Sequence, residues 1–258
     1  MNSTDYNKYL VSACEIAREA GHIIMVYFSD GYTSNKKSDN SPVTEADIAA
    51  NKYIIEKLTA IAPHIPIIAE EDEILGSSEH KRFFLVDPLD GTRSFVRGEP
   101  EFTVNIALIE NNLPVFGVIY CPPQDILYFG MVGDNAYKQI GGNTPEIIKT
   151  RKFPDDGLTV VRSRSHPSKA TNAYLETLNI KEVISGSSSV KFCMVAEGSA
   201  DIYPRFGRTM EWDTAAGHAI LNAAGGRVET ADGKPFLYGK EGFENPAFIG
   251  FGRNNSNK

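Results

Sequence analysis

Acidic side chains recur in this sequence where apolar segments end or where a helix is expected to begin. Glu70 and Asp87 each follow a short apolar segment, Asp90 comes three residues later, and Asp213 precedes a helical pattern. Open α/β sheets bind ligands outside the carboxyl ends of their strands. Carboxylate oxygens are also the ligands that hard divalent cations prefer. The distribution therefore predicts a divalent-metal site built from separated parts of the chain.

The densest of these features is the DPLDGT run at residues 87–92. Pro88 fixes the backbone after the first carboxylate, and Gly91 permits a tight turn after the second. Both carboxylates and the Leu89 carbonyl can then face one point, while Gly91 and Thr92 offer backbone N–H groups to a phosphate. The alternative is an ordinary turn leaving a strand. The second Asp and the Thr directly after an apolar strand favour a functional run.

Three other acids have structural alternatives. Glu70 begins a row of acidic residues that has the composition of a solvated turn. Asp213 at a helix start is a good N-cap, although a capping carboxylate keeps lone pairs for a metal. Thr44 and Asp47 have the spacing of a capping box, and that spacing alone favours capping over catalysis for Asp47.

The elements that must position these residues follow from periodicity and turn residues. Helices are predicted over residues 4–28, 44–60, 168–178, 187–197 and 212–224, and strands over 67–69, 83–86, 102–110, 115–120, 159–161 and 201–203. Residues 31–40 are expected to form a loop or hairpin. Near residue 150 the pattern changes to alternating strands and helices. We therefore predict an α+β metal-site domain over 1–150 and an α/β domain over 151–258 that completes the site with Asp213.

Composition limits the classes of function. The chain has 258 residues, 41% hydrophobic and 23% charged, with a formal charge of −7. An acidic protein of this kind is not expected to bind a nucleic acid polymer, which needs basic patches. Three widely spaced cysteines, Cys14, Cys121 and Cys193, argue against disulfides and zinc and suit a reducing compartment. Neither a signal peptide nor a transmembrane segment is expected, so the predicted location is the cytoplasm.

Several runs in this order resemble the inositol-monophosphatase superfamily. They are the PVTEAD run at 42–47, Glu70-Glu71, the DPLDGT run at 87–92 and the WDTAAG run at 212–217. The resemblance covers nearly the whole chain. It implies an α/β fold, an α/β/α/β/α layered sandwich.

Further runs resemble the CysQ-type branch of that superfamily. They are NSPVT at 40–44, EFTVNIAL at 101–108, SSVKFC at 188–193 and YPRFG at 203–207. Members of this branch are 3′(2′),5′-bisphosphate nucleotidases, which convert adenosine 3′,5′-bisphosphate (PAP) to AMP and phosphate in sulfate assimilation. Arg93-Ser94 departs from the pair usual in either group of the superfamily.

The resemblance also implies roles for individual residues. Two or three Mg²⁺ ions would be bound by Glu70, Asp87, Asp90, Asp213 and the Leu89 carbonyl, and Li⁺ would inhibit. Thr92 and Asp47 would activate the attacking water. The substrate would contact Glu70, Leu89, Asp90, Gly91, Thr92 and Asp213, with Lys191 and Arg205 as candidates for its second phosphate. The alternative for those two cations is a solvated surface position. His218 and Cys193 are expected to be packing residues.

Other functions stay open at this point. The same machinery serves inositol monophosphatases and fructose-1,6-bisphosphatases, and substrate choice depends on pocket shape. A non-catalytic Mg²⁺- or nucleotide-binding sensor would lack a ligand or the Thr, and neither is missing; a structural Ca²⁺-binding module would show no turnover. The resemblance also allows PAPS as a substrate and peripheral association with the cytoplasmic face of the inner membrane. The expected state is a monomer or a homodimer.

Overall fold

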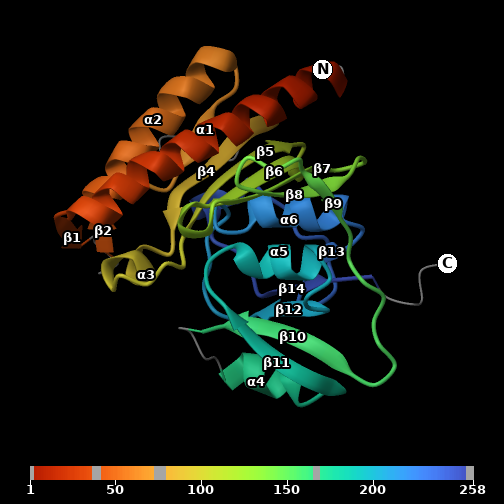
Figure 1. Ribbon diagram of the computed structural model, residues 1–258. Helices are drawn as coiled ribbons and strands as arrows, with labels where there is room; N and C mark the ends of the chain where they lie inside the picture. Colours follow the sequence, from red (N-terminus) through yellow and green to blue (C-terminus); the bar gives the residue numbers. More distant parts are fainter. Residues whose placement is uncertain (1–2, 37–41, 73–79, 165–168, 254–258) are drawn as a thin grey trace.

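The computed structural model describes residues 3–36, 42–72, 80–164 and 169–253, and these form five layers (Figure 1). The long helices α1 (Ser3–Asp30) and α2 (Glu45–Ile61) cover the outer face of a seven-stranded sheet. Helices α5 (Val190–Ala196) and α6 (Ala215–Ala223) lie between this sheet and a five-stranded one. Helix α4 (Lys169–Leu175) covers the far face of the second sheet. The predicted α/β/α/β/α sandwich is therefore confirmed.

The first sheet is antiparallel except at one edge. In spatial order its strands are β3 (Ile67–Ala69), β4 (Arg82–Asp90), β5 (Thr103–Glu110), β6 (Leu113–Cys121), β7 (Ile126–Met131), β8 (Ala136–Ile140) and β9 (Glu146–Ile148). Among the strand pairs that the described residues form in this sheet, β3 and β4 alone run parallel, with Ala69 opposite Val86. Their carboxyl ends therefore meet at one edge of the sheet, and this register places Glu70 beside Asp87.

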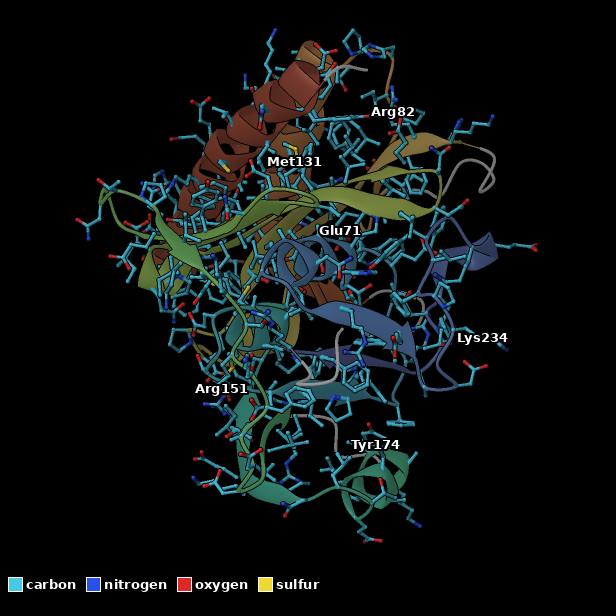
Figure 2. The ribbon with its side chains drawn as sticks, turned by 90° about the vertical axis from the view of Figure 1, so that its right-hand side faces the viewer. Glu71, Arg82, Met131, Arg151, Tyr174 and Lys234 are labelled. Carbon is cyan, nitrogen blue, oxygen red and sulfur yellow. The ribbon has the colours of Figure 1, made fainter. Side chains whose placement is uncertain are left out.

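The second sheet contains strands from the later part of the chain only. Its order is β11 (Ile180–Gly186), β10 (Leu158–Ser163), β12 (Ile202–Arg205), β14 (Phe248–Phe251) and β13 (Arg227–Thr230). Strands β11, β13 and β14 were not predicted: β11 and β13 are polar-rich and partly exposed, and β14 is an apolar run of only four residues that contains Gly250. Figure 2 shows the layers from the side, with Tyr174 of α4 at the end of the molecule opposite to α1.

The N-terminal helices form where the apolar pattern predicted them. Leu10, Ala17 and Ile24 are buried against the first sheet. Gly21 lets α1 approach β6 closely, because a Cβ there would lie 2.4 Å from the Tyr120 ring. A short antiparallel ladder between β1 (Ser34–Lys36) and β2 (Pro42–Thr44) then leads into α2. The two paired strands have the arrangement of the predicted hairpin. The residues between them, 37–41, lie outside the described part of the chain.

Three predicted boundaries were wrong in an informative way. Strand β4 runs on through Pro88 to Asp90, with irregular pairing between Asp87 and Asp90, because proline has no N–H to donate to the ladder. The helix predicted from residue 187 begins at Val190, after Ser188 adopts a left-handed backbone with φ 47°. The helix predicted from residue 212 begins at Ala215, after a turn.

The two sheets divide the sequence between residues 148 and 158, close to the predicted boundary. Their layers nevertheless share one buried cluster, since α6 packs directly on β6. A Cβ at Gly117 of β6 would lie 2.2 Å from the Ala216 carbonyl of α6. The division into two domains near residue 150 stays a prediction.

Candidate active site

A cavity of about 250 Å³ lies where the two sheets approach each other. It is lined by nine of the ten residues predicted for the site: Glu70, Asp87, Leu89, Asp90, Gly91, Thr92, Lys191, Arg205 and Asp213. Its lining contains one group of carboxylates and one group of cationic side chains, which we call the acidic wall and the basic wall. The tenth residue, Asp47, lies directly behind Thr92.

The centre of the acidic wall is formed by Glu70, Asp87 and Asp213. Each offers a carboxylate oxygen, and these oxygens lie within 4.8 Å of one another. The Asp87 side chain is buried; its Oδ1 accepts from the Leu89 N–H at 3.0 Å, while its Oδ2 has no hydrogen-bond partner among the described residues. An orphaned buried carboxylate oxygen facing two further carboxylates is costly without a compensating cation. The donor set therefore fits a divalent metal ion.

The electrostatics of this cluster agree with its geometry. Burial raises the pKa of Asp87, and the neighbouring charges of Glu70, Asp90 and Asp213 raise it further. Burial likewise raises the pKa of Asp213, again reinforced by Asp90 and Glu70. Like charges at this separation disfavour ionisation unless positive charge joins them. Bound divalent cations would supply that charge and keep all the carboxylates ionised.

Asp90 lies at the side of this group. It lines the same cavity but is not one of the three carboxylates that cluster most closely. Its Oδ2 accepts from Ser189 Oγ at 2.9 Å and lies 3.5 Å from Asn105 Nδ2. Burial raises its pKa, partly offset by the positive charge of Lys191 and by the hydrogen bond from Ser189. Asp90 therefore extends the acidic lining of the cavity beyond the three clustered carboxylates.

Asp47 both caps helix α2 and reaches Thr92. Its Oδ2 accepts from the Thr44 N–H at 2.7 Å and from Thr44 Oγ1 at 2.5 Å, which completes the predicted capping box. Its Oδ1 lies 3.1 Å from Thr92 Oγ1, which also lies 3.1 Å from the Leu89 carbonyl. A threonine hydroxyl has one proton and two lone pairs. With its proton directed at these acceptors, Thr92 keeps a lone pair for a water in the cavity.

Asp213 is not an N-cap. The cap of α6 is Thr214, and the Asp213 carboxylate instead accepts from the Met210 N–H at 2.7 Å. That bond holds the turn at 210–213 closed and leaves the other carboxylate oxygen to the cavity. The capping alternative for Asp213 is therefore wrong, because the helix begins later than the sequence indicated.

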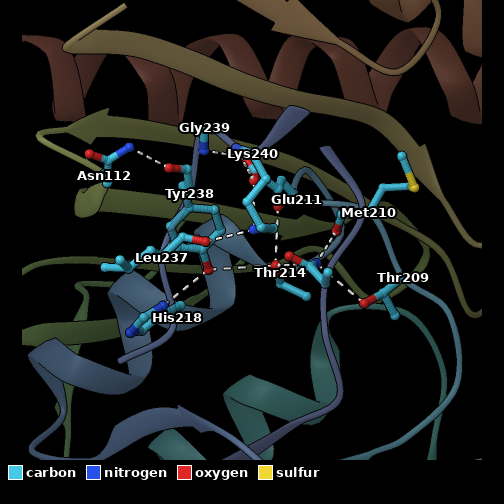
Figure 3. A network of polar contacts seen from close by, with 11 residues as sticks. Asn112, Thr209, Met210, Glu211, Thr214, His218, Leu237, Tyr238, Gly239 and Lys240 are labelled. Carbon is cyan, nitrogen blue, oxygen red and sulfur yellow. Dashed lines mark hydrogen bonds and ion pairs between the residues drawn. The ribbon is translucent and has the colours of Figure 1, made fainter. Parts of the chain in front are cut away.

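A buried polar network supports this turn from behind (Figure 3). The Glu211 carboxylate accepts from the Gly239 N–H at 2.7 Å, the Lys240 N–H at 2.9 Å and the Lys240 ammonium at 2.6 Å. Thr214 Oγ1 lies 3.1 Å from Asn245 Nδ2. Buried charge is stable when it is fully hydrogen-bonded. The network ties the turn that carries Asp213 to the 239–245 segment.

His218 belongs to the same network and not to the cavity. Its Nδ1 lies 3.0 Å from the Tyr238 hydroxyl, and burial lowers its pKa to about 3. Cys193 is completely buried in the shared core, and burial raises its pKa. Both residues are packing residues, as predicted.

The basic wall contains one surprise. Lys191 is only 4% exposed, so its surface alternative is wrong: the first turn of α5 points inward and not to solvent. Its ammonium donates to the Ser188 carbonyl at 2.5 Å and lies 5.3 Å from the centre of the Tyr203 ring. Burial lowers its pKa to about 8, partly offset by Asp90. The Lys191 ammonium has three N–H donors and donates one of them to the Ser188 carbonyl. It can therefore also donate to an anion bound in the cavity.

Arginines complete this wall. The Arg205 side chain is half-buried; its Nη2 donates to the Arg208 carbonyl at 3.1 Å, and its Nε is buried without a partner among the described residues. Arg93 and Arg208 also line the cavity but were not predicted as site residues. Arg208 follows the predicted strand and Arg93 follows the DPLDGT run, so proximity to those motifs was the available signal.

Comparisons with known proteins agree with this architecture. The model of the inositol monophosphatase family matches residues 5–255. The chain is 45% identical over 239 residues to the 3′(2′),5′-bisphosphate nucleotidase CysQ of Buchnera aphidicola, covering 90% of this chain and 88% of that protein. It is 43% identical to the CysQ protein of Escherichia coli K12, covering 93% of this chain and 98% of that protein.

The fold agrees as well. The crystal structure of CysQ from Bacteroides thetaiotaomicron, described as a bacterial member of the inositol monophosphatase family, superposes with a TM-score of 0.82 at 39% identity. The match covers 95% of this chain and 97% of that one. With sequence, fold and cavity in agreement over almost the full length, this chain belongs to the inositol monophosphatase family.

Proposed function

We propose that this protein is a Mg²⁺-dependent 3′(2′),5′-bisphosphate nucleotidase that converts PAP to AMP and phosphate. The observation that carries the proposal is the combination of two kinds of group in one cavity: the Glu70, Asp87 and Asp213 cluster and the buried Lys191 line the same space. One wall suits the phosphoryl group that reacts, and the other suits a second anionic group on the same small molecule. The 43–45% identity to CysQ proteins supports this substrate over a sugar phosphate.

The acidic wall has the groups for phosphoryl transfer to water. Glu70, Asp87, Asp90, Asp213 and the Leu89 carbonyl would hold two or three Mg²⁺ ions, whose positive charge stabilises the phosphoryl oxygens and makes a bound water more acidic. Thr92 accepts a hydrogen bond from the attacking water and orients it. Asp47, which is held by Thr44, accepts a hydrogen bond from the Thr92 hydroxyl. This bond turns a lone pair of the Thr92 oxygen toward that water. Phosphoryl transfer needs mainly such positioning and electrostatic stabilisation.

The basic wall would hold the rest of the substrate. Lys191 and Arg205 would bind the second phosphate through charge-assisted hydrogen bonds. Gly91 and Thr92 would contact the reacting phosphate at the first turn of α3 (Thr92–Val96), which begins from a left-handed Gly91 at φ 102°. A side chain at residue 91 is excluded sterically, because a Cβ would lie 2.8 Å from the Glu101 carbonyl. PAPS, the analogue of PAP whose 5′-phosphate carries a sulfate, would be a second substrate.

The setting of the enzyme follows from a few further features. Cys14, Cys121 and Cys193 are all unpaired, as expected in a reducing compartment. Among the helices of the described residues, none combines the length and apolar character needed to cross a membrane. We infer a cytoplasmic enzyme, monomeric or homodimeric, with peripheral membrane association as a further prediction.

The deciding experiment measures phosphate release with Mg²⁺ from PAP, inositol 1-phosphate and fructose 1,6-bisphosphate at equal concentrations. We expect kcat/KM to favour PAP by at least about a hundredfold, roughly 2.7 kcal/mol of transition-state discrimination. Chelation by EDTA should abolish release, added Mg²⁺ should restore it, and Li⁺ should inhibit it. Preference for a sugar phosphate would overturn the substrate, and no release from any of the three would favour a non-catalytic sensor.

A further inference from the structure

Ser189 stands where a serine ordinarily caps a helix, yet it does not cap. It is the N-cap residue of α5, but its side chain accepts no capping hydrogen bond. Its hydroxyl lies instead 2.9 Å from Asp90 Oδ2 and 2.8 Å from the main-chain carbonyl of Asp213. Asp90 ends a strand of the first sheet, and Asp213 precedes α6. One buried hydroxyl therefore joins two candidate metal ligands that come from distant parts of the chain.

The hydroxyl of Ser189 is held in turn from the first sheet. Asn105 Nδ2, on β5, donates to Ser189 Oγ at 2.9 Å, and Thr103 Oγ1 donates to Asn105 Oδ1 at 3.0 Å. All three side chains are buried. Because Asn105 occupies an acceptor lone pair of Ser189, the single proton of Ser189 is directed toward Asp90 and the Asp213 carbonyl.

The backbone beside Ser189 is specialised too. Ser188 has φ 47°, a left-handed conformation that costs free energy for a residue with a side chain. Such strain persists where the surroundings over-determine the conformation. Here the left-handed conformation turns the chain so that the Ser188 carbonyl accepts a hydrogen bond from the Lys191 ammonium. The Ser189 hydroxyl then lies beside Asp90 of the acidic wall.

We propose that Ser189 is a positioning residue that sets the spacing between Asp90 and Asp213, with Asn105 and Thr103 holding it in place. The inference rests on the metal site of the proposed function. Groups that hydrogen-bond to metal ligands typically change metal affinity or activity by about 10- to 100-fold when removed. Ser189 therefore acts on Mg²⁺ binding through the ligands, without touching the reacting atoms.

The test compares Mg²⁺ binding to the full chain by isothermal titration calorimetry in the absence of substrate. For Ser189→Ala we expect the Mg²⁺ dissociation constant to rise about tenfold. Activity should need correspondingly more Mg²⁺ for half-saturation, and kcat should recover when Mg²⁺ is saturating. Ser189→Thr keeps the hydroxyl and should retain an affinity close to that of the wild type.

Thr150→Val is the matched control. This variant also loses a buried hydroxyl, which lies 3.2 Å from the Ala224 carbonyl in the wild type. Thr150 does not line the cavity. It should lower thermal stability without changing Mg²⁺ affinity. Unchanged affinity in Ser189→Ala, or an equal loss in Thr150→Val, overturns the positioning role.

Two further outcomes are separable. If Ser189→Ala fails to fold, Thr103→Val removes the next donor in the chain and should weaken Mg²⁺ binding in the same direction; an unchanged affinity then overturns the proposal. If the wild type releases no phosphate from PAP while Ser189→Ala still weakens Mg²⁺ binding, the proposed function fails and the positioning role stands.

Discussion

The acidic and basic walls of the cavity differ in how the chain builds them. Glu70 and Asp87 follow paired residues of β3 and β4, which are parallel neighbours in the first sheet, so backbone register brings them together. Lys191 and Arg205 belong to separate elements of the second half, a helix and a strand end, and meet only through packing. Glu70 and Asp87 are thus placed by local sequence and strand pairing, whereas Asp213 and the second wall are placed by tertiary structure.

This difference separates chemistry from substrate choice. The acidic wall presents groups needed for any phosphate ester, and its partners are mostly main-chain and short side-chain groups such as Leu89 N–H and Thr44. The basic wall depends on where two long cationic side chains end. Changes to the first wall should therefore reduce turnover for every substrate, and changes to the second should discriminate among substrates.

The largest expected effect comes from Asp47→Asn, which tests the acidic wall. The amide keeps the size of the carboxylate but has one acceptor oxygen and one NH2 donor, so it cannot accept from both the Thr44 N–H and the Thr92 hydroxyl as Asp47 does. We expect kcat to fall about 10²- to 10⁴-fold. The capping role alone accounts for only about 1 kcal/mol of stability. Steady-state kinetics on PAP, together with urea unfolding, separates the two contributions.

Thr44→Ala is the control for that variant. It removes the side-chain half of the capping box but leaves the Asp47 carboxylate, which still accepts from the backbone N–H of residue 44. A comparable loss of stability with far smaller loss of kcat is expected. A folded and fully active Asp47→Asn enzyme would show that Asp47 is a cap and nothing more.

The same contrast explains what the sequence could and could not predict. The acidic wall was predictable because each candidate metal ligand lies next to its own strand or helix signal, and contiguous motifs carry both the residue and its placement. The burial of Lys191 was not, because α5 starts later than its composition suggests, after the strained Ser188. Strands β11, β13 and β14 also escaped prediction, since pairing within the second sheet and not local pattern stabilises them.

The support behind the ligands was hidden for a related reason. The bonds that join Ser189 to Asn105, and Glu211 to the 239–240 segment, link residues 84 and 28–29 positions apart. No single-sequence pattern marks such pairs. From the sequence, Ser189 looks like a helix cap and Glu211 looks like an ordinary charged residue before Trp212. Only the structure shows that their side chains instead bind Asn105 and the 239–240 segment.

A smaller effect is expected from Lys191→Ala, which tests the basic wall. A charge-assisted hydrogen bond contributes about 1.5–3 kcal/mol, so kcat/KM for PAP should fall about 10- to 100-fold. A simple 3′-monophosphate should be spared, since it lacks the second phosphate that we propose Lys191 binds. Because burial lowers the pKa of Lys191 to about 8, the advantage of the wild type on PAP should also shrink as pH rises from 7 to 9.

Lys181→Ala is the matched lysine control, because that side chain is exposed on β11 and pairs with Asp156 at 2.5 Å. It should leave both substrates unaffected. Equal losses on PAP and the monophosphate in Lys191→Ala would remove Lys191 from second-phosphate binding and assign it to the architecture of the site.

The smallest expected effect concerns His218 in the network behind Asp213. Its pKa is lowered to about 3 in the folded protein, against about 6.5 when unfolded, so the unfolded chain binds more protons between these values. Stability should therefore fall as pH is lowered through 6.5. Between pH 7.5 and 5.5 this group alone should remove about 1.4 kcal/mol from the free energy of unfolding.

Asp87 and Asp213 have raised pKa values, so they act in the opposite sense: the folded state gains protons on acidification and is stabilised. Comparing wild type with His218→Asn isolates the histidine, because both proteins keep these carboxylates. Urea unfolding without Mg²⁺ should show the variant less stable at pH 7.5 but losing about 1.4 kcal/mol less on going to pH 5.5. Identical pH slopes would mean that His218 takes up its proton as readily in the folded protein as in the unfolded chain, so that the network behind Asp213 accepts a charge which its burial argues against.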